Sequence, residues 1–450
     1  MEPVTTTSAR SRVPTIPAVE LIVGFGMVLA VIASRTRTAG PDVFLRIADN
    51  VATGIVPYRD FMLEYPPLAL FPVALPRLIA GPSDSAYNRI FIAIAVIVTI
   101  ATAAVIAWLA ERRWSALSRN GSLLAFGAMV LAALPQVIWR FDILAAFFSA
   151  VALAAVASRK PGWAGFALAA GAAVKLYPAF LLPVLIAYYL FGRRWRSAAA
   201  LIFGFVALLA AIGALIFVVA GSDGFTFLRY QEDRGFEVES VIAGLVFAAN
   251  NLLGTPIDVF HGYGAFQIRS PLIATLTGPY AVAMLVLGAL YAVSLFLSFQ
   301  RDVRRFGNVQ PRTLVAFLLA TLLLMMLANK VLSPQYVAWL LPFGALLPWR
   351  KTALLVVICA LTTLEFPIAF GALLDAWPSA VAILNLRNLL LLVLFLWLIY
   401  PRSTAGSVRE WRYSTGRPPT RRRLRTSADP SPGAAVLERS ESSATPQRRP

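Results

Sequence analysis

Four carboxylates stand in one polar stretch of this sequence, residues 41–67 (PDVFLRIADNVATGIVPYRDFMLEYPP), between two strongly apolar stretches. They are Asp42, Asp49, Asp60 and Glu64. A carboxylate can take a proton from a hydroxyl group, bind a cation or accept hydrogen bonds from a polar ligand. The question for the rest of the chain is which cations and polar groups the fold brings to the same place.

Composition indicates a membrane protein. Of the 450 residues, 59% are hydrophobic and only 14% are charged, which exceeds what a soluble core needs. A helix spans the hydrocarbon layer with roughly 20 apolar residues. Apolar stretches that predict helices lie at 19–34, 87–110, 121–138, 142–157, 162–174, 178–191, 198–220, 275–299, 312–328, 336–349, 352–370 and 380–400. The sequence therefore predicts an all-α integral membrane protein with about twelve transmembrane helices.

The predicted organisation has three parts: an N-terminal tail (1–18), a polytopic domain (19–401) and a basic tail (402–450). The basic tail has too few large apolar residues to bury a core, so we expect it to be disordered. Two long loops, 35–86 and 221–271, interrupt the polytopic domain. Within the first, residues 66–80 carry four prolines and are too short for a full crossing, so we expect a re-entrant or interfacial helix there.

The net charge of +18 favours orientation in a membrane over nucleic-acid binding. Eleven of the forty basic residues lie after Pro401, and many others occupy short connections at 111–120, 158–162, 192–196, 301–307 and 349–351. The positive-inside rule assigns these connections and both termini to the cytoplasm, so the acidic loops face outward from the cell membrane. Cys359 is the only cysteine and His261 the only histidine, which excludes an internal disulfide and disfavours a Zn or Fe site. A divalent cation would need carboxylate ligands.

This topology brings a polar set to the outer face: Asp42, Asp60, Glu64, Asp142, Lys175, Asp233, Glu237, Glu239, Lys330 and Gln335. Lys175 and Lys330 interrupt apolar stretches at helix ends, where an unpaired ammonium is costly; each is interpreted as an anion-binding group or as part of an ion pair. Asp60 and Glu64 are four residues apart and would share one face of a helix as an acid pair or cation site, or else they shape the loop before two prolines. For Asp142 the simplest reading is a local ion pair with Arg140.

Six segments in chain order carry a resemblance to a known family. They are Asp42 after the first helix, GIVPYRDFMLEYPPLAL (54–70), RFD (140–142), KLYP (175–178), RGFEVESV (234–241) and NKVLSPQYVAWLLP (329–342). Together they resemble glycosyltransferase family 87, membrane enzymes of the GT-C superfamily. The resemblance implies inverting transfer of a hexose, above all mannose, from a polyprenyl-phosphate donor to a lipid-linked or cell-envelope glycan. It also implies that Asp42 is the general base, while Arg46 stands where the family often has an aromatic residue, which leaves the acceptor open.

The same chemistry needs cations for the leaving phosphate and polar or aromatic groups for the sugar. The outer-face cations are Arg59, Arg140, Lys175, Arg234 and Lys330. Tyr65, Glu239 and Gln335 are candidates for sugar contacts, although Tyr65 is more typical of an interfacial aromatic belt and Glu239 of an ordinary outer-loop charge. Two alternatives remain: a transporter or flippase of lipid-linked sugars, and an oligosaccharide polymerase or ligase. A transporter should carry ionisable groups in mid-helix, and their grouping at one face favours the enzyme.

Overall fold

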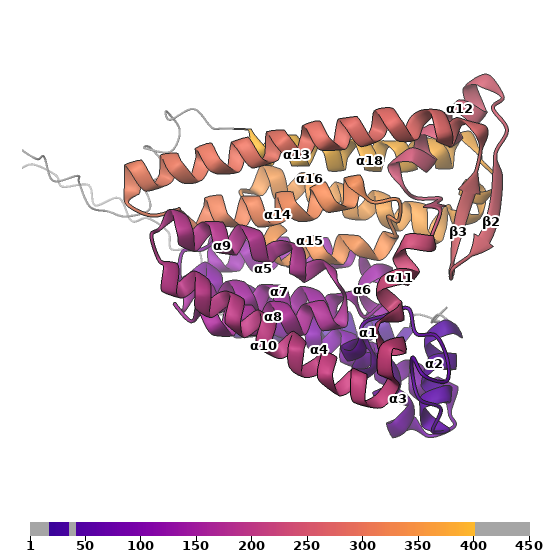
Figure 1. The fold of residues 1–450 in the computed structure, drawn as a ribbon, viewed down its shortest axis with the longest axis horizontal. Helices are drawn as coiled ribbons and strands as arrows, with labels where there is room; N and C mark the ends of the chain where they lie inside the picture. The colour runs from indigo at the N-terminus through magenta and orange to yellow at the C-terminus, as the bar shows by residue number, and fades with distance from the viewer. Residues whose placement is uncertain (1–17, 36–41, 401–450) are drawn as a thin grey trace, which may run out of the picture. The chain divides into compact units, whose positions relative to one another are not determined.

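The computed structural model describes residues 18–35 and 42–400, and most of them are helical (Figure 1). The expectations for the N-terminal tail before Ala18 and for the basic tail 402–450 lie outside the described residues. The first part of the chain forms α1 (Ala18–Arg35), α2 (Asp42–Ala52), η1 (Pro67–Ala69), α3 (Leu70–Ala80), α4 (Asp84–Glu111), α5 (Arg119–Ala132), α6 (Leu134–Ile138), α7 (Asp142–Ala157), α8 (Pro161–Val174), η2 (Tyr177–Leu181) and α9 (Leu182–Phe191).

The second part alternates long helices with one small sheet. Its elements are α10 (Trp195–Ala220), η3 (Gly221–Phe225), α11 (Thr226–Asp233), β1 (Phe236–Glu237), α12 (Val241–Leu253), β2 (Asp258–Gly262), β3 (Ala265–Arg269), α13 (Pro271–Phe306), α14 (Pro311–Ala328), η4 (Pro334–Tyr336), α15 (Val337–Gly344), α16 (Trp349–Thr363), η5 (Leu364–Ile368), α17 (Phe370–Leu374) and α18 (Pro378–Ile399).

Helical structure lies in every apolar range that predicted a helix. Among the described residues, 6 helices are long and apolar enough to cross a membrane: Asp84–Glu111, Trp195–Leu228, Pro271–Phe306, Pro311–Ala328, Trp349–Ile368 and Pro378–Ile399. The other apolar helices have 10–17 residues. The chain is therefore a helical membrane protein, and the count of about twelve crossings stays a prediction.

Prolines explain where helices are shorter than expected. The range 121–138 divides at Ala133 into α5 and α6, where Pro135 in the first turn lacks the N–H that would continue the hydrogen-bond ladder. The range 336–349 begins as a short 3-10 turn at Pro334, and its helix α15 ends at Gly344. The short elements at these breaks remain buried, since Gln136, Pro334 and Tyr336 are all shielded from solvent.

The two long loops contain structure that periodicity did not reveal. Asp60 and Glu64 lie in an irregular segment between α2 and η1, so the interpretation in which they share a helical face is wrong. Residues 221–271 contain α12 and a three-stranded antiparallel sheet of order β1-β3-β2. The β2–β3 hairpin turns at Tyr263 and Gly264, both with positive φ, which suits a tight hairpin. The prediction of an all-α fold therefore missed this small β-sheet.

Buried apolar side chains form two clusters. The larger, called the main core, joins side chains from α1 to α16 with the second half of α18, including Leu391 and Phe395. The smaller, called the second core, consists of Val238, Ile242, Ala243, Val246, Phe247, Ile268, Leu373, Ala380, Val381 and Leu384. The second core therefore binds the 236–269 segment to α17 and the first half of α18. In Figure 1, β2, β3 and α12 lie at the same end of the helices as α2 and α3.

Close packing of α8 against α10 fixes the position of α8. A Cβ atom on Gly165 of α8 would lie 1.9 Å from the carbonyl oxygen of Leu201 and 2.8 Å from the amide nitrogen of Phe205, both in α10. Membrane helices approach this closely only where small residues remove side-chain bulk.

We expect Gly165→Ala to separate α8 from α10 and to destabilise the protein by about 1–3 kcal/mol, the usual range for overpacking. The thermal unfolding midpoint of the detergent-solubilised protein measures this. Gly288→Ala in α13 is the matched control, because a Cβ there meets nothing within 4 Å. Equal midpoints for the two variants would show that the helix contact is not tight.

Candidate functional site

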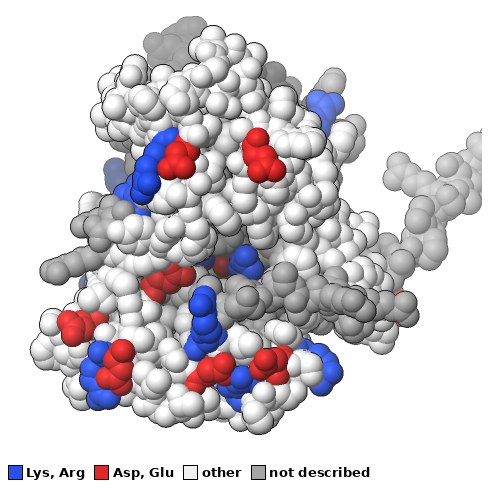
Figure 2. Space-filling view, turned by 90° about the vertical axis from the view of Figure 1, so that its right-hand side faces the viewer, with Lys and Arg blue, Asp and Glu red and all other residues white. Residues whose placement is uncertain are grey.

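A cavity of about 460 Å³ opens between the main core and the second core. Figure 2 shows this end of the molecule, hollowed between the part with β2, β3 and α12 and the part with α2 and α3, with charged side chains at the hollow. The charged and polar lining residues are Glu64, Tyr65, Arg140, Lys175, Arg234, Glu237, Glu239, His261, Asn329, Ser333 and Gln335. Segments far apart in sequence therefore form one polar site.

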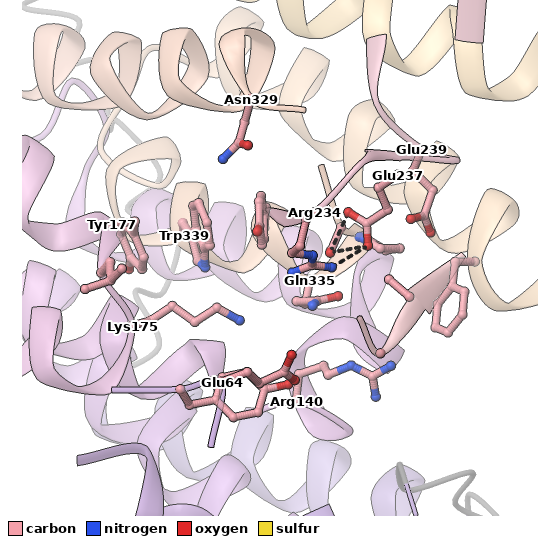
Figure 3. A pocket seen from close by; sticks show the side chains of 18 of the residues that line it. Glu64, Arg140, Lys175, Tyr177, Arg234, Glu237, Glu239, Asn329, Gln335 and Trp339 are labelled. Atoms are coloured by element: carbon pink, nitrogen blue, oxygen red, sulfur yellow. Dashed lines mark hydrogen bonds and ion pairs between the residues drawn. The ribbon is translucent and has the colours of Figure 1, made fainter. Parts of the chain in front are cut away.

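Lys175 reaches into the cavity from the C-terminal end of α8 (Figure 3). Its ammonium lies 3.0 Å from the carboxylate of Asp142, the first residue of α7, whose side chain is only 1% exposed. Trp339 Nε1 donates a hydrogen bond of 2.8 Å to Asp142 Oδ1, the same oxygen that lies 3.0 Å from the ammonium. The negative charge of Asp142 at the N-terminus of α7 and the positive charge of Lys175 at the C-terminus of α8 both interact favourably with the helix dipoles. The predicted ion pair of Asp142 with Arg140 was therefore wrong, because Asp142 pairs with Lys175.

Aromatic rings surround the Lys175 ammonium. Its Nζ lies 5.6 Å from the ring centre of Tyr65, 5.3 Å from Phe141 and 5.7 Å from Tyr336. Such contacts attract a cation through the negative face of each ring. Rings of Trp339 and Tyr336 stack with their centres 3.8 Å apart. The lysine thus has a fixed position, held by one buried carboxylate and three rings.

Glu237 belongs to the opposite wall of the cavity. Ser333 Oγ donates to both its carboxylate oxygens at 2.8 and 2.9 Å, and Arg234 Nη2 lies 3.7 Å away. The backbone N–H of Glu237 donates to the carbonyl of Lys330 at 3.0 Å. Burial raises the pKa of the Glu237 carboxyl despite these partners. The side chain is thereby tied to the loop that precedes η4.

Glu239, two residues on, is 3% exposed and also lines the cavity. Burial raises its pKa well above the usual value, and the nearby carboxylates of Glu237 and Glu365 raise it further. Arg140 faces the cavity from the loop before α7 and lies 5.8 Å from the ring centre of Phe366. Figure 3 shows Glu64 and Arg140 on the side of Lys175, and Glu237 and Glu239 across the cavity from it.

The structure brings most of the predicted site residues together. Those that line the cavity are Glu64, Tyr65, Arg140, Lys175, Arg234, Glu239 and Gln335. Asp142 is not in the lining, but it forms the ion pair with Lys175, which is. Lys330 is not in the lining, although its backbone carbonyl holds Glu237. The side chain of Asp42 lies outside the described residues, and Phe44 on the same helix α2 lines the cavity.

Asp60 lies away from the cavity lining. It is exposed, and Arg59 holds it through hydrogen bonds of 2.8 and 2.9 Å. These bonds and the backbone N–H of Val56 lower the pKa of Asp60 to about 2. Asp49, the remaining acid of the polar stretch 41–67, forms an ion pair with Arg77 of α3.

Sequence reasoning missed several lining residues. They are Phe266, Phe366, Phe370 and His261, of which His261 lies in β2. The buried pair of Glu365 and Arg387 was missed as well. The sequence did contain a signal for this pair, because both residues interrupt apolar stretches. Ionisable groups at membrane depth are functional candidates by default.

The fold and the cavity define a helical membrane protein with a polar cavity at its helix ends, where ionisable groups are functional candidates by default. The profile of glycosyltransferase family 87 matches residues 63–329, more than half of the chain. The chain therefore belongs to glycosyltransferase family 87, and it is a glycosyltransferase. No curated protein matches it individually.

We expect removal of the Asp142 carboxylate to destabilise the protein strongly, because Lys175 and the Trp339 N–H lose a partner in a buried setting. Breaking a buried ion pair in this way typically costs about 3–5 kcal/mol. In a double-mutant cycle measured by thermal unfolding, Asp142→Leu and Lys175→Met together should cost less than the sum of the single changes. Additive costs would show that the two side chains do not interact.

Proposed function

We propose that this chain transfers a hexose, with mannose as the first sugar to test, from a polyprenyl-phosphate donor to a lipid-linked or cell-envelope glycan. Family membership supports sugar transfer. The observation that carries the choice of donor is that three cations, Arg140, Lys175 and Arg234, and three carboxylates line one cavity. The cations suit a phosphate, and the carboxylates suit sugar hydroxyls.

The phosphate is proposed to bind on the side of Lys175. The lysine offers a point charge, and the arginines can contact two phosphate oxygens at once. Phe180 and Met325 also line the cavity, and Phe180 is 52% exposed. These apolar groups give the isoprenoid chain of a lipid donor a surface beside the phosphate. Cation contacts stabilise the negative charge that develops on the leaving phosphate.

Asp42 is proposed to be the general base. It takes the proton of the acceptor hydroxyl while the hydroxyl oxygen attacks the anomeric carbon and the bond from that carbon to the phosphate oxygen breaks. Attack from the side opposite the phosphate inverts the configuration. Glu64, Glu239 and Gln335 are proposed to bind sugar hydroxyls. Within the described residues no group of three or more His, Cys, Asp and Glu side chains is placed to hold a metal ion.

We expect Asp42→Asn to abolish transfer and to leave donor binding intact, since general-base catalysis is lost while the cations remain. The measurement is incubation of membranes with radiolabelled polyprenyl-phosphate mannose, followed by identification of the labelled product. Asp49→Asn is the matched control from the same helix α2, because Asp49 pairs with Arg77. Near-normal turnover in Asp42→Asn would remove Asp42 from this role.

The same assay separates the alternatives. A transporter or flippase would move the labelled donor across the membrane without forming a glycan, and a polymerase or ligase would require a preassembled oligosaccharide donor. Product formation from the monosaccharide donor alone contradicts both.

We also propose that the cavity faces the outside of the cell membrane, that about twelve helices cross it, with residues 66–80 re-entrant or interfacial, and that both termini are cytoplasmic. The basic end of α13, with Arg304 and Arg305, supports the orientation, because it lies at the end of the helices opposite to β2 and β3 (Figure 1). Local thinning of the bilayer and snorkelling of flanking residues allow the shorter helices to cross.

Labelling of variants that each carry one added cysteine tests this orientation. A membrane-impermeant thiol reagent should label Asp60→Cys in intact cells and Arg305→Cys only after the membrane is opened. The native Cys359 is buried, so it gives little background. The reverse pattern would invert the proposed topology.

A further inference from the structure

Arg387 lies at the junction of the two cores. It stands in α18 three residues after Leu384 of the second core and four residues before Leu391 of the main core. Its side chain is 0% exposed, and that of Glu365, its ion-pair partner, is 1% exposed. The distance between Arg387 Nη2 and Glu365 Oε2 is 3.0 Å. Both residues lie beyond the part of the chain that the family profile matches.

The same guanidinium also holds the cavity wall. Arg387 Nη2 donates to the backbone carbonyl of Glu239 at 3.0 Å. Glu365 stands in η5 directly before Phe366, another lining residue. The pair thus joins the end of α16, the middle of α18 and the segment that carries the acids of the cavity.

Stability alone gives little reason for this pair. Desolvation of a buried ion pair offsets most of its attraction, and apolar residues of similar size often replace such a pair without loss. Within the described part of the chain, Arg387 Nε and Nη1 and both polar side-chain atoms of the adjacent Asn388 have no hydrogen-bond partner. Each such buried group costs about 1–3 kcal/mol. An arrangement this costly is better explained by the geometry that it imposes.

We propose that Arg387, oriented by Glu365, is a positioning residue that fixes the Glu237–Glu239 wall opposite Lys175. Residues 237–239 form a short strip that is held at both ends. Ser333 and the Lys330 carbonyl hold Glu237 at one end, and Arg387 holds the carbonyl of Glu239 at the other. Between them Val238 is buried in the second core. The significance for catalysis rests on the proposed function, whereas the clamp on the backbone does not.

The test replaces the pair with apolar residues, Glu365→Leu with Arg387→Met, so that no unpaired charge is left and the fold is kept. We expect kcat with the polyprenyl-phosphate donor to fall at least about tenfold, since small displacements of positioned groups have effects of that size or larger. Arg387→Lys keeps the charge but not the planar fork, so it should restore only part of kcat. Asn385→Ala is the matched control, because Asn385 joins α18 to the carbonyl of Gly244, away from the cavity acids.

Amide hydrogen exchange provides a second measurement that needs no donor. The N–H groups of Glu237, Val238 and Ser240 donate to backbone carbonyls, so they report on the strip directly. In the double variant, exchange in residues 236–243 should accelerate at least about tenfold while α7 and α8 keep their protection.

Reduced kcat together with faster local exchange supports the proposal, and unchanged exchange overturns it whatever the activity. Normal kcat with a loosened strip also overturns the positioning role. If the wild-type protein uses no polyprenyl-phosphate sugar, the proposed function fails, and the exchange measurement alone decides whether Arg387 clamps the strip. If the double variant does not fold, kcat and amide exchange are measured for Arg387→Lys instead, and the same outcomes support or overturn the proposal.

Discussion

The buried ion pair of Asp142 and Lys175 is the interaction on which the cavity depends. An ammonium near an apolar core is costly unless a carboxylate lies beside it, and Asp142, at 1% exposure, needs Lys175 to offset the cost of burying its charge. The geometry of this pair requires the start of α7 and the end of α8 to lie together, and the Trp339 N–H adds α15. One charged contact therefore brings three helices together beside the cavity, and the close packing of α8 on α10 keeps that arrangement in place.

The other wall of the cavity is built differently. Its acids belong to a segment that packs on the second core, and three polar contacts tie them to the rest of the fold: Ser333 with Glu237, the Lys330 carbonyl with the Glu237 N–H, and Arg387 with the Glu239 carbonyl. Lys175 and Glu237 therefore lie on two sides of a cavity of about 460 Å³ that are supported by separate cores. Each side carries charges of both signs, since Glu64 lies on the side of Lys175 and Arg234 lies beside Glu237 (Figure 3).

Much of this could be predicted from the sequence because membrane helices give a strong signal. The helical ranges follow from apolar length, and the seven predicted residues that line the cavity follow from the grouping of polar residues in the predicted outer loops and from the family resemblance. The ion-pair partners could not be predicted. Asp142 pairs with Lys175, which is 33 residues away in the sequence, and not with Arg140, which is two residues away, because helix packing brings Lys175 to it. The hairpin of β2 and β3 was missed for a related reason: its strands have five residues each, and they alternate too briefly against Gly and aromatic neighbours.

The electrostatics of the described acids also bear on which carboxylate can act as the base. A base must be ionised before the acceptor arrives, and burial together with two neighbouring carboxylates raises the pKa of Glu239 well above its usual value, so its protonated form is favoured. Glu237 has its oxygens occupied by Ser333 and faces Arg234, which leaves little room for an incoming hydroxyl. Glu239 is therefore better suited to hydrogen bonding with a ligand than to proton abstraction, and Glu237 is better suited to holding the cavity wall in place. The proposal of Asp42 as the base agrees with this, because Asp42 begins α2 and the same helix contributes Phe44 to the lining of the cavity.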